Sequence, residues 1–378
     1  MDLLYADYAA TTPLDPRVLE AMMPYLTNVY FNAASSHAGG MQAQMAVMKA
    51  RMEIASHIGA LMNEIIFTSG ATEAINIAIL GAMRHARAEG GRNRLVTVRT
   101  EHAAVRDAAE RCAAEGADVA WLPVDREGRV DLEAAREMIT DRTAVVSVMA
   151  VNNETGVKQD LAAIGALARE RGAWFMTDAT QAYGKMPLNV EELGIDLMTF
   201  SAHKIYGPKG TGALYVRSRR DRTCVLDPLM FGGGQEHGLR SGTLNVPGIV
   251  GLATAGTLAL SAINEESAHV RALRDAFESA LTSIPGVSVN AAAAERSYNI
   301  SNITFPIPAD RLALDMPGVA CSKGSACSSA KPKPSPVLTA MGRTEEEANN
   351  TLRFSFGRMT TQAEIDALIA TTRPLLGA

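Results

Sequence analysis

The fold is indicated most clearly by residues 65–73, which read Ile65-Ile66-Phe67-Thr68-Ser69-Gly70-Ala71-Thr72-Glu73. An apolar run of strand length passes through a small-residue turn directly into a helical stretch from about Ala74 to Ala86. The same alternation continues from about residue 50 to residue 220, with further apolar runs at 94–98, 144–149 and 174–177. Such alternation is typical of βαβ units and a mainly parallel sheet. In a sheet of this kind we expect the chemistry just beyond the carboxyl ends of the strands.

Composition narrows the class of protein. The chain has 378 residues, 47% of them hydrophobic and 20% charged, and a net charge of −5, which is typical of a folded globular protein. No long basic run is interleaved with aromatic residues, so we do not expect direct nucleic-acid binding. Four scattered cysteines predict neither a disulfide framework nor a zinc site, and they favour a cytoplasmic location. The N-terminus does not resemble a signal peptide.

We predict two domains, a large one over residues 15–250 and a smaller one built from residues 1–14 and 251–378. The change is marked by a long helical pattern from about Gly248 to Ser283, after which strands and helices recur less regularly. The uncharged stretch 241–264 contains Pro247 and several polar residues, so we expect a loop and a buried helix there and no membrane segment. Residues 322–336 are rich in Ser, Gly, Lys and Pro and predict a mobile loop.

Two features at strand ends suggest a site for a charged ligand. Ala71 and Thr72 open a helix directly after a strand, where backbone N–H groups and a hydroxyl can hold a phosphate, although a simple helix cap is an equal alternative for this turn alone. Asp178 ends the apolar run 174–177, and a buried carboxylate there needs a cationic partner unless it only caps the next helix.

A lysine at a third strand end completes the pattern. Lys204 follows an apolar run at 196–200 and lies beside Ser201 and His203, a position in which an amine can be desolvated and nucleophilic. A phosphate anchor, a carboxylate and an imine-forming amine are together what pyridoxal 5'-phosphate requires. His102 can stack on its ring and Asn153 can approach the ring hydroxyl, although a strand-end histidine and an ordinary turn are the plainer alternatives.

Several motifs resemble those of the cysteine desulfurases (NifS/IscS-like, class-V aminotransferases), and the resemblance covers nearly the whole chain. The motifs are Asp7-Tyr8-Ala9-Ala10-Thr11-Thr12, Thr68 to Glu73, Val151-Asn152-Asn153-Glu154, Asp178-Ala179-Thr180-Gln181, Ser201-Ala202-His203-Lys204, Arg240-Ser241-Gly242-Thr243, Ser325-Ala326-Cys327 and Leu352-Arg353-Phe354-Ser355. The resemblance implies the α/β architecture of fold-type-I pyridoxal phosphate enzymes, with a mainly parallel seven-stranded sheet flanked by helices and a smaller α+β domain. It also implies a homodimer.

The resemblance further implies roles for individual residues. Lys204 resembles the Schiff-base lysine, Asp178 the partner of the ring nitrogen and His102 the stacking ring. Ala71, Thr72, Ser201 and His203 resemble phosphate contacts, joined by Thr243 from the other subunit, while Asn153 and Gln181 resemble neighbours of the ring oxygen. Arg353, together with Asn153, resembles the group that binds the substrate carboxylate, for which a guanidinium fork is suited.

Cys327 distinguishes this family from other pyridoxal phosphate enzymes. A thiolate on a loop can attack the substrate sulfur and leave as a persulfide. Cys327 is also a candidate transient ligand of an iron–sulfur cluster. We expect no other metal site. Cys321 departs from the family pattern, and we expect it to pack at a strand end, with a sulfur relay or a disulfide to Cys327 as alternatives. The chain ends without the extension that housekeeping members use to dock an iron–sulfur scaffold, which leaves the acceptor open.

We therefore predict a cysteine desulfurase that converts L-cysteine to L-alanine. Its persulfide sulfur would pass to a protein acceptor for iron–sulfur clusters, tRNA thiolation or sulfur-modified DNA. A selenocysteine lyase, or another pyridoxal phosphate lyase or aminotransferase, is the alternative among enzymes. A noncatalytic assembly platform is the alternative from another class. A nucleotide-binding protein has little support because the glycine-rich stretches match neither phosphate-loop motif.

Overall fold

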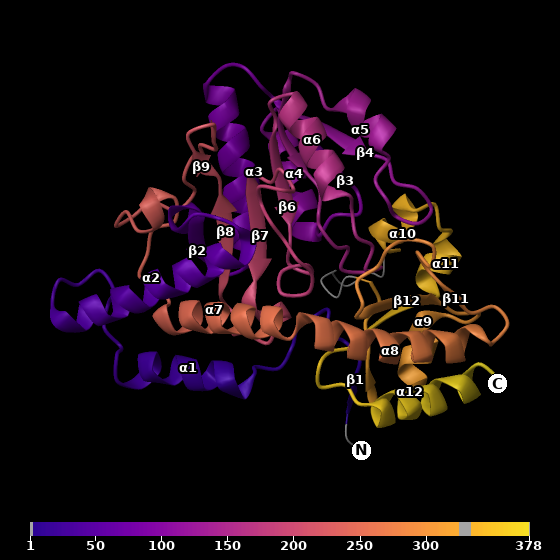
Figure 1. Ribbon diagram of the computed structural model, residues 1–378. Helices are drawn as coiled ribbons and strands as arrows, with labels where there is room; N and C mark the ends of the chain where they lie inside the picture. Colours follow the sequence, from indigo (N-terminus) through magenta and orange to yellow (C-terminus); the bar gives the residue numbers. More distant parts are fainter. Residues whose placement is uncertain (1–2, 325–333, 378) are drawn as a thin grey trace.

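The computed structural model describes residues 3–324 and 334–377 (Figure 1). Its centre is a seven-stranded sheet in the order β2-β8-β7-β6-β5-β3-β4. The pairs that join β3 to β4, β3 to β5, β5 to β6 and β6 to β7 are parallel, whereas β8 is antiparallel to both β2 and β7. The predicted mainly parallel sheet is thus confirmed. The strands are β2 (Ile65–Thr68), β3 (Arg94–Val98), β4 (Asp118–Leu122), β5 (Thr143–Ser147), β6 (Trp174–Asp178), β7 (Leu197–Ser201) and β8 (Gly212–Val216).

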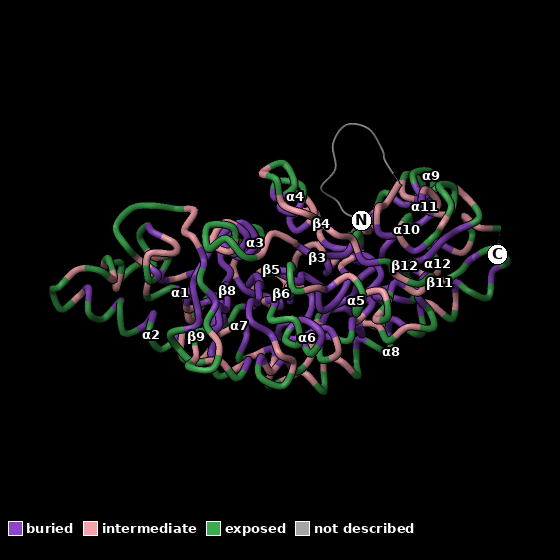
Figure 2. The backbone as a smooth tube through the Cα atoms, turned by 90° about the horizontal axis from the view of Figure 1, so that it is seen from above, coloured by how far each residue is buried: buried purple, intermediate pink, exposed green. Residues whose placement is uncertain are grey.

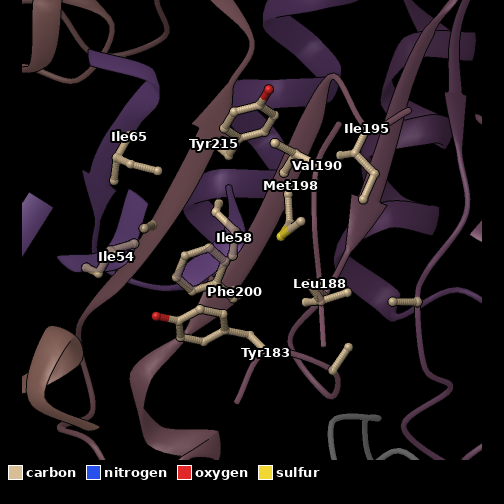
Figure 3. Close-up of a cluster of buried hydrophobic side chains, with 14 of the residues drawn as sticks. Ile54, Ile58, Ile65, Tyr183, Leu188, Val190, Ile195, Met198, Phe200 and Tyr215 are labelled. Carbon is tan, nitrogen blue, oxygen red and sulfur yellow. The ribbon is translucent and has the colours of Figure 1, made fainter. Parts of the chain in front are cut away.

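The sheet is buried on both faces because its apolar residues alternate between two cores. Along β8, Ala213 and Tyr215 belong to one core, whereas Leu214 and Val216 belong to the other, as the two-residue period of a strand requires. Figure 3 shows part of the first core, where Tyr215 lies near side chains of β7 and α2. Figure 2 shows the buried strands in the middle of the molecule and exposed backbone at its rim.

Helices cover both faces of the sheet. One core is closed by α2, α6 and α7, and the other by α3 and α4. The helical stretch expected at 74–86 lies within α3. The α-helices of this part are α1 (Pro16–Thr27), α2 (Ala38–Ile58), α3 (Ala71–Ala88), α4 (Ala103–Ala114), α5 (Leu132–Met138), α6 (Leu161–Glu170) and α7 (Val246–Ser261). Short elements complete this part: η1 (Met62–Glu64), η2 (Ala202–Lys204), η3 (Glu236–Gly238), β9 (Ser218–Arg219) and β10 (Arg222–Thr223).

A smaller antiparallel sheet, β11-β12-β14, lies beside this unit with its own apolar core. The N-terminal strand β1 pairs with β13 next to it, and both chain ends lie on this side of the molecule (Figure 1). These contacts support our proposal that residues 1–14 belong with the C-terminal part. The elements are β1 (Leu4–Tyr5), α8 (Ile263–Thr282), β11 (Ser288–Val289), β12 (Ile300–Thr304), α9 (Ala309–Asp315), β13 (Val319–Ala320), α10 (Pro336–Ala340), α11 (Glu345–Asn349), β14 (Thr351–Ser355) and α12 (Gln362–Leu375).

The long helical pattern expected from about Gly248 to Ser283 is two helices, α7 and α8, joined at Ala262. The break separates two packing partners, because α7 packs on α1 and α2 while α8 packs on α12 and the small sheet. Within the described ranges no single helix has both the length and the apolarity to cross a membrane. Only α7 and α8 taken together have the required length and apolarity, and that pair is bent by 72°.

Candidate active site

A pocket of about 600 Å³ opens at the carboxyl ends of the parallel strands. It brings together ten of the twelve residues that the sequence singled out, although they come from segments as distant as α3 and β14. These ten are Ala71, Thr72, His102, Asn153, Asp178, Gln181, Ser201, His203, Lys204 and Arg353.

One end of the pocket is formed by the N-terminus of α3. Gly70 precedes the helix with φ +154°, and a Cβ added there would lie 3.7 Å from Ser201 Oγ, so the missing side chain leaves a small space facing that hydroxyl. The first-turn N–H groups of any helix lack partners within the helix and carry the positive end of its dipole. With the hydroxyls of Thr72 and Ser201 beside them, these N–H groups make a suitable cradle for a phosphate.

A carboxylate also lies at this end, and its charge is balanced. Glu73 accepts hydrogen bonds from Arg240 Nε at 2.6 Å and from the Ser69 N–H at 2.7 Å. Burial opposes ionisation of Glu73, but the bonds from Arg240 and Ser69 lower the pKa of its carboxyl below the ordinary value. Glu73 is therefore an ion-pair partner that anchors the segment around Arg240.

Asp178 also lines the pocket, at the end of β6, with 4% of its surface exposed. Its Oδ1 accepts a hydrogen bond from the Thr180 N–H at 2.9 Å. The nearby Glu101 is also buried, and burial together with the Asp178 charge raises the pKa of Glu101 well above its ordinary value. Burial and this neighbour thus favour the protonated form of Glu101.

His102 lies between these groups and also caps α4. Its Nδ1 accepts a hydrogen bond from the Ala104 N–H at 3.2 Å, so the proton of the neutral ring is on Nε2. Burial lowers the pKa of His102, opposed by the Asp178 charge and reinforced by the Lys204 charge. The His102 ring therefore caps the helix and lines the pocket at the same time.

Lys204 follows β7 and is enclosed by the N-terminal segment. Its Nζ donates to the carbonyl oxygens of Ala9 at 2.8 Å and Ala10 at 2.6 Å. Thr12 fastens this segment, because its Oγ1 donates to the His203 carbonyl at 3.0 Å and accepts from the Tyr206 N–H at 2.7 Å. Sequence reasoning assigned the Asp7–Thr12 motif no role, and its contact with Lys204 is through backbone carbonyls that no residue type reveals.

His203 lies on the same turn and is neutral. Burial, reinforced by the charges of Lys204, Lys209 and Lys185, lowers its pKa to about 4. Its Nδ1 lies 3.1 Å from Thr11 Oγ1, which ties the turn to the N-terminal segment a second time.

Arg353 comes from β14 of the small sheet, and its side chain is 3% exposed. Its Nη2 donates to Asp7 Oδ1 at 2.7 Å, and its Nη1 donates to the Asn153 carbonyl at 2.7 Å. Ser322 Oγ donates to the other oxygen of Asp7 at 2.8 Å. Asn153 thus contacts Arg353 through its backbone, and Asp7 is a neighbour of the site that sequence reasoning did not single out.

Two predicted residues remain, one of which the structure describes. Thr243 is exposed and does not line the pocket, and Cys327 lies outside the described residues. Cys321 packs against the small core directly after β13, as expected, and burial raises the pKa of its thiol to about 12. Among the described residues no group of three or more His, Cys, Asp or Glu side chains is arranged to hold a metal ion.

Comparisons with known proteins agree with this arrangement. Residues 4–368 match the family model Aminotransferase class-V. Cysteine desulfurase IscS of Neisseria meningitidis serogroup C (strain 053442) is 48% identical over 364 residues, covering 96% of this chain and 89% of that protein.

Solved structures are similar as well. A NifS-like protein has a TM-score of 0.92 at 33% identity over the whole of both chains. SspA in complex with cysteine has a TM-score of 0.83 at 35% identity, covering 94% of this chain and 99% of that one. The chain therefore belongs to the cysteine desulfurases of the class-V aminotransferase family.

Proposed function

We propose that this chain binds pyridoxal 5'-phosphate in the 600 Å³ pocket and uses it to convert L-cysteine to L-alanine, passing the sulfur to Cys327 as a persulfide. The observation that carries the proposal is the convergence of the α3 N-terminus, Asp178, Lys204 and Arg353 on one cavity. A similar structure, SspA, is a complex with cysteine, which supports cysteine as the substrate.

The residues present fit this cofactor. The space at Gly70, with the first turn of α3 and the hydroxyls of Thr72 and Ser201, suits its phosphate. The buried carboxylate of Asp178 at the end of β6 would suit a protonated ring nitrogen. Gln181 and Asn153 line the same pocket and would be neighbours of the ring oxygen, and His102 would offer its ring for stacking. When bound, the cofactor supplies an electron-withdrawing ring that stabilises negative charge at the substrate Cα.

The chain's own residues supply the remaining steps. Arg353 binds the substrate carboxylate with a guanidinium already oriented by Asp7 and the Asn153 carbonyl. Lys204 Nζ accepts the proton from the substrate Cα, with the Ala9 and Ala10 carbonyls holding the resulting ammonium. His102, neutral with its proton on Nε2, can donate that proton within the pocket.

The sulfur step balances without an outside oxidant. The Cys327 thiolate attacks the substrate sulfur, an S–S bond forms, and the substrate C–S bond breaks. L-Cysteine and one thiol thus become L-alanine and one persulfide, and the Cβ of alanine takes up the proton. The high pKa of the buried Cys321 thiol argues against Cys321 as the nucleophile.

We also propose a homodimer that acts in the cytoplasm and delivers sulfur to an acceptor protein. Four methionines on one face of α2 are 47–68% exposed, namely Met41, Met45, Met48 and Met52, and such a patch suits a second copy of the chain. Thr243 is exposed and outside its own pocket, which suits a contact with the partner's phosphate site. The described cysteines are all free thiols, in keeping with a reducing compartment.

Alanine release from L-cysteine tests this proposal. The purified, cofactor-loaded protein with excess dithiol is expected to release alanine over many turnovers, and Lys204→Ala is expected to release almost none. The control Lys158→Met removes a lysine whose ion pair with Glu295 lies outside the pocket, and it is expected to keep the wild-type rate. Absence of alanine from the loaded wild type, or an undiminished rate in Lys204→Ala, would overturn the proposal.

A further inference from the structure

Lys185 is a half-buried lysine that none of the steps above uses. It does not line the pocket, but its Nζ donates to Gln181 Oε1 at 2.9 Å, four residues earlier in the chain. Burial lowers the pKa of Lys185 to about 7, reinforced by the charges of Lys204 and Arg353 and opposed by that of Glu266. Placing a charged amine in such surroundings costs free energy, so we expect this amine to serve a function.

A line of hydrogen bonds connects this amine to the amine of Lys204. Gln181 Nε2 donates to the Ala9 carbonyl at 2.8 Å, and the same carbonyl accepts from Lys204 Nζ at 2.8 Å. One side-chain amide and one peptide carbonyl therefore separate the two lysines. Gln181 is only 3% exposed, so water does not readily replace either of its bonds.

Both partners of the Gln181 amide agree on the way it faces. The Ala9 carbonyl only accepts, so Nε2 faces Ala9, and Oε1 then faces Lys185, which donates to it. The reversed amide would put two donors together at Lys185 and two oxygens together at Ala9. Lys185 is the one donor to Oε1 among the described hydrogen bonds, so without the lysine this end of Gln181 is not held in place.

We propose that Lys185 is a positioning residue for the reaction, which orients the Gln181 amide and, through the Ala9 carbonyl, the amine of Lys204. In the pH range in which it is protonated, Lys185 also places a positive charge near that amine. The inference rests on the proposed function, because it takes Lys204 as the residue that reacts with the cofactor. Its chemistry is nevertheless independent of the sulfur step and of Cys327.

The test is a pH titration of the visible absorption band of enzyme-bound pyridoxal phosphate, measured without cysteine. Lys185→Met keeps the length of the side chain but removes its charge and its donors. Loss of a neighbouring positive charge stabilises the protonated form of the chromophore at Lys204, so its titration midpoint is expected to move to higher pH. Lys185→Arg, which keeps both charge and donors, is expected to stay near the wild-type midpoint. Lys158→Met serves as the matched control.

Kinetics give the second readout. In Lys185→Met we expect kcat to fall about 10- to 100-fold with little change in KM for cysteine, because the misplaced group is the amine and not the substrate-binding guanidinium. A folded, loaded Lys185→Met protein with an unchanged midpoint and an unchanged kcat would overturn the proposal.

A second variant covers the case in which Lys185→Met does not fold or load. Gln181→Glu still accepts from Lys185 but cannot donate to the Ala9 carbonyl, so it breaks the connection at its other end. It is expected to shift the midpoint and to lower kcat, and wild-type values for both would overturn the proposal. Because the titration needs no cysteine, a wild type that binds the cofactor but releases no alanine contradicts the proposed function alone.

Discussion

At the scale of single residues, the site depends on charged groups whose partners come from distant segments. Arg353 and Asp7 are separated by 346 residues in the chain, yet their side chains are 2.7 Å apart. The sequence predicted Asp178 and Lys204 because each follows an apolar run, and a charged residue in that position is a local signal. No such local signal marks Asp7, the Ala9 and Ala10 carbonyls or Lys185. Their roles follow only from contacts between segments that are distant in the sequence.

Arg353→Lys tests the guanidinium that orients the substrate. Lysine offers one point charge in place of a planar fork, and it cannot reach both Asp7 and the Asn153 carbonyl while binding a carboxylate. We expect KM for L-cysteine to rise about 10- to 100-fold, with a smaller change in kcat. Arg311→Lys, at an exposed position on α9, is the control. Steady-state kinetics with an unchanged KM in Arg353→Lys would exclude this role.

At the scale of elements, the position of the α3 N-terminus depends on a close approach of two backbones. A Cβ on Gly212 of β8 would lie 2.6 Å from the Phe200 carbonyl oxygen and 2.7 Å from Gly70 Cα, so neither neighbour can give way by a side-chain movement. The strand and the helix were predicted from their patterns. Their spacing was not, because a glycine in a strand does not reveal what approaches it.

Gly212→Ala is therefore expected to lower the free energy of unfolding by about 1–3 kcal/mol and to weaken binding of pyridoxal phosphate. Gly91→Ala is the matched control, because an added Cβ at that position meets no atom within 4 Å. Urea unfolding and cofactor titration measure the two effects. If Gly212→Ala matches the control in both, the tight contact with Gly70 does not set the shape of the cradle.

The packing of α2 on α7 predicts a dependence of stability on pH. His57 bonds Tyr183 Oη at 2.8 Å and Thr257 Oγ1 at 3.1 Å, and burial lowers its pKa to about 4. The unfolded state, with a histidine pKa of about 6.5, binds more protons between these values, so stability is lost as the pH falls from about 6.5 towards 4.

His57→Gln is expected to remove this part of the pH dependence. Between pH 7 and pH 5 the free energy of unfolding should fall by about 1 kcal/mol less than in the wild type, after allowance for screening at a partly exposed ring. His203 has a similarly low pKa, but it is present in both proteins, so its contribution to the pH dependence of stability cancels in the comparison. Equal losses of stability in the two proteins would show that His57 does not titrate as the burial implies.

At the scale of the whole molecule, the composition and the alternation of strands and helices predicted the layered α/β architecture. The small sheet and the strand pair beside it were harder to predict, because β1, β11 and β13 have two residues each and carry no periodicity. The role proposed for Thr243 depends on the assembly, since within one subunit Thr243 is exposed and does not line the pocket.

Hybrid dimers test the proposal that each pocket takes Thr243 from the partner. Thr243→Asp places a carboxylate where the partner's phosphate is expected, and Lys204→Ala removes the reactive amine, so each homodimer should be nearly inactive. A dimer that combines the two variants has one pocket with both native residues, and we expect it to recover up to about half of the wild-type alanine release. Co-expression with two purification tags isolates the hybrid. Recovery no greater than in the homodimers would contradict a contribution across subunits.

The central claim is that sulfur leaves L-cysteine as a persulfide on Cys327 while alanine is formed. The most direct measurement is a single-turnover experiment with sulfur-labelled L-cysteine and no reductant, in which alanine and the labelled protein sulfur are counted and the labelled residue is located by mass spectrometry. We expect about one alanine and one labelled sulfur per active site, with the label on Cys327, and neither product from Cys327→Ala. Alanine formation by Cys327→Ala at the wild-type level, or a label on Cys321 in the wild type, would contradict the account.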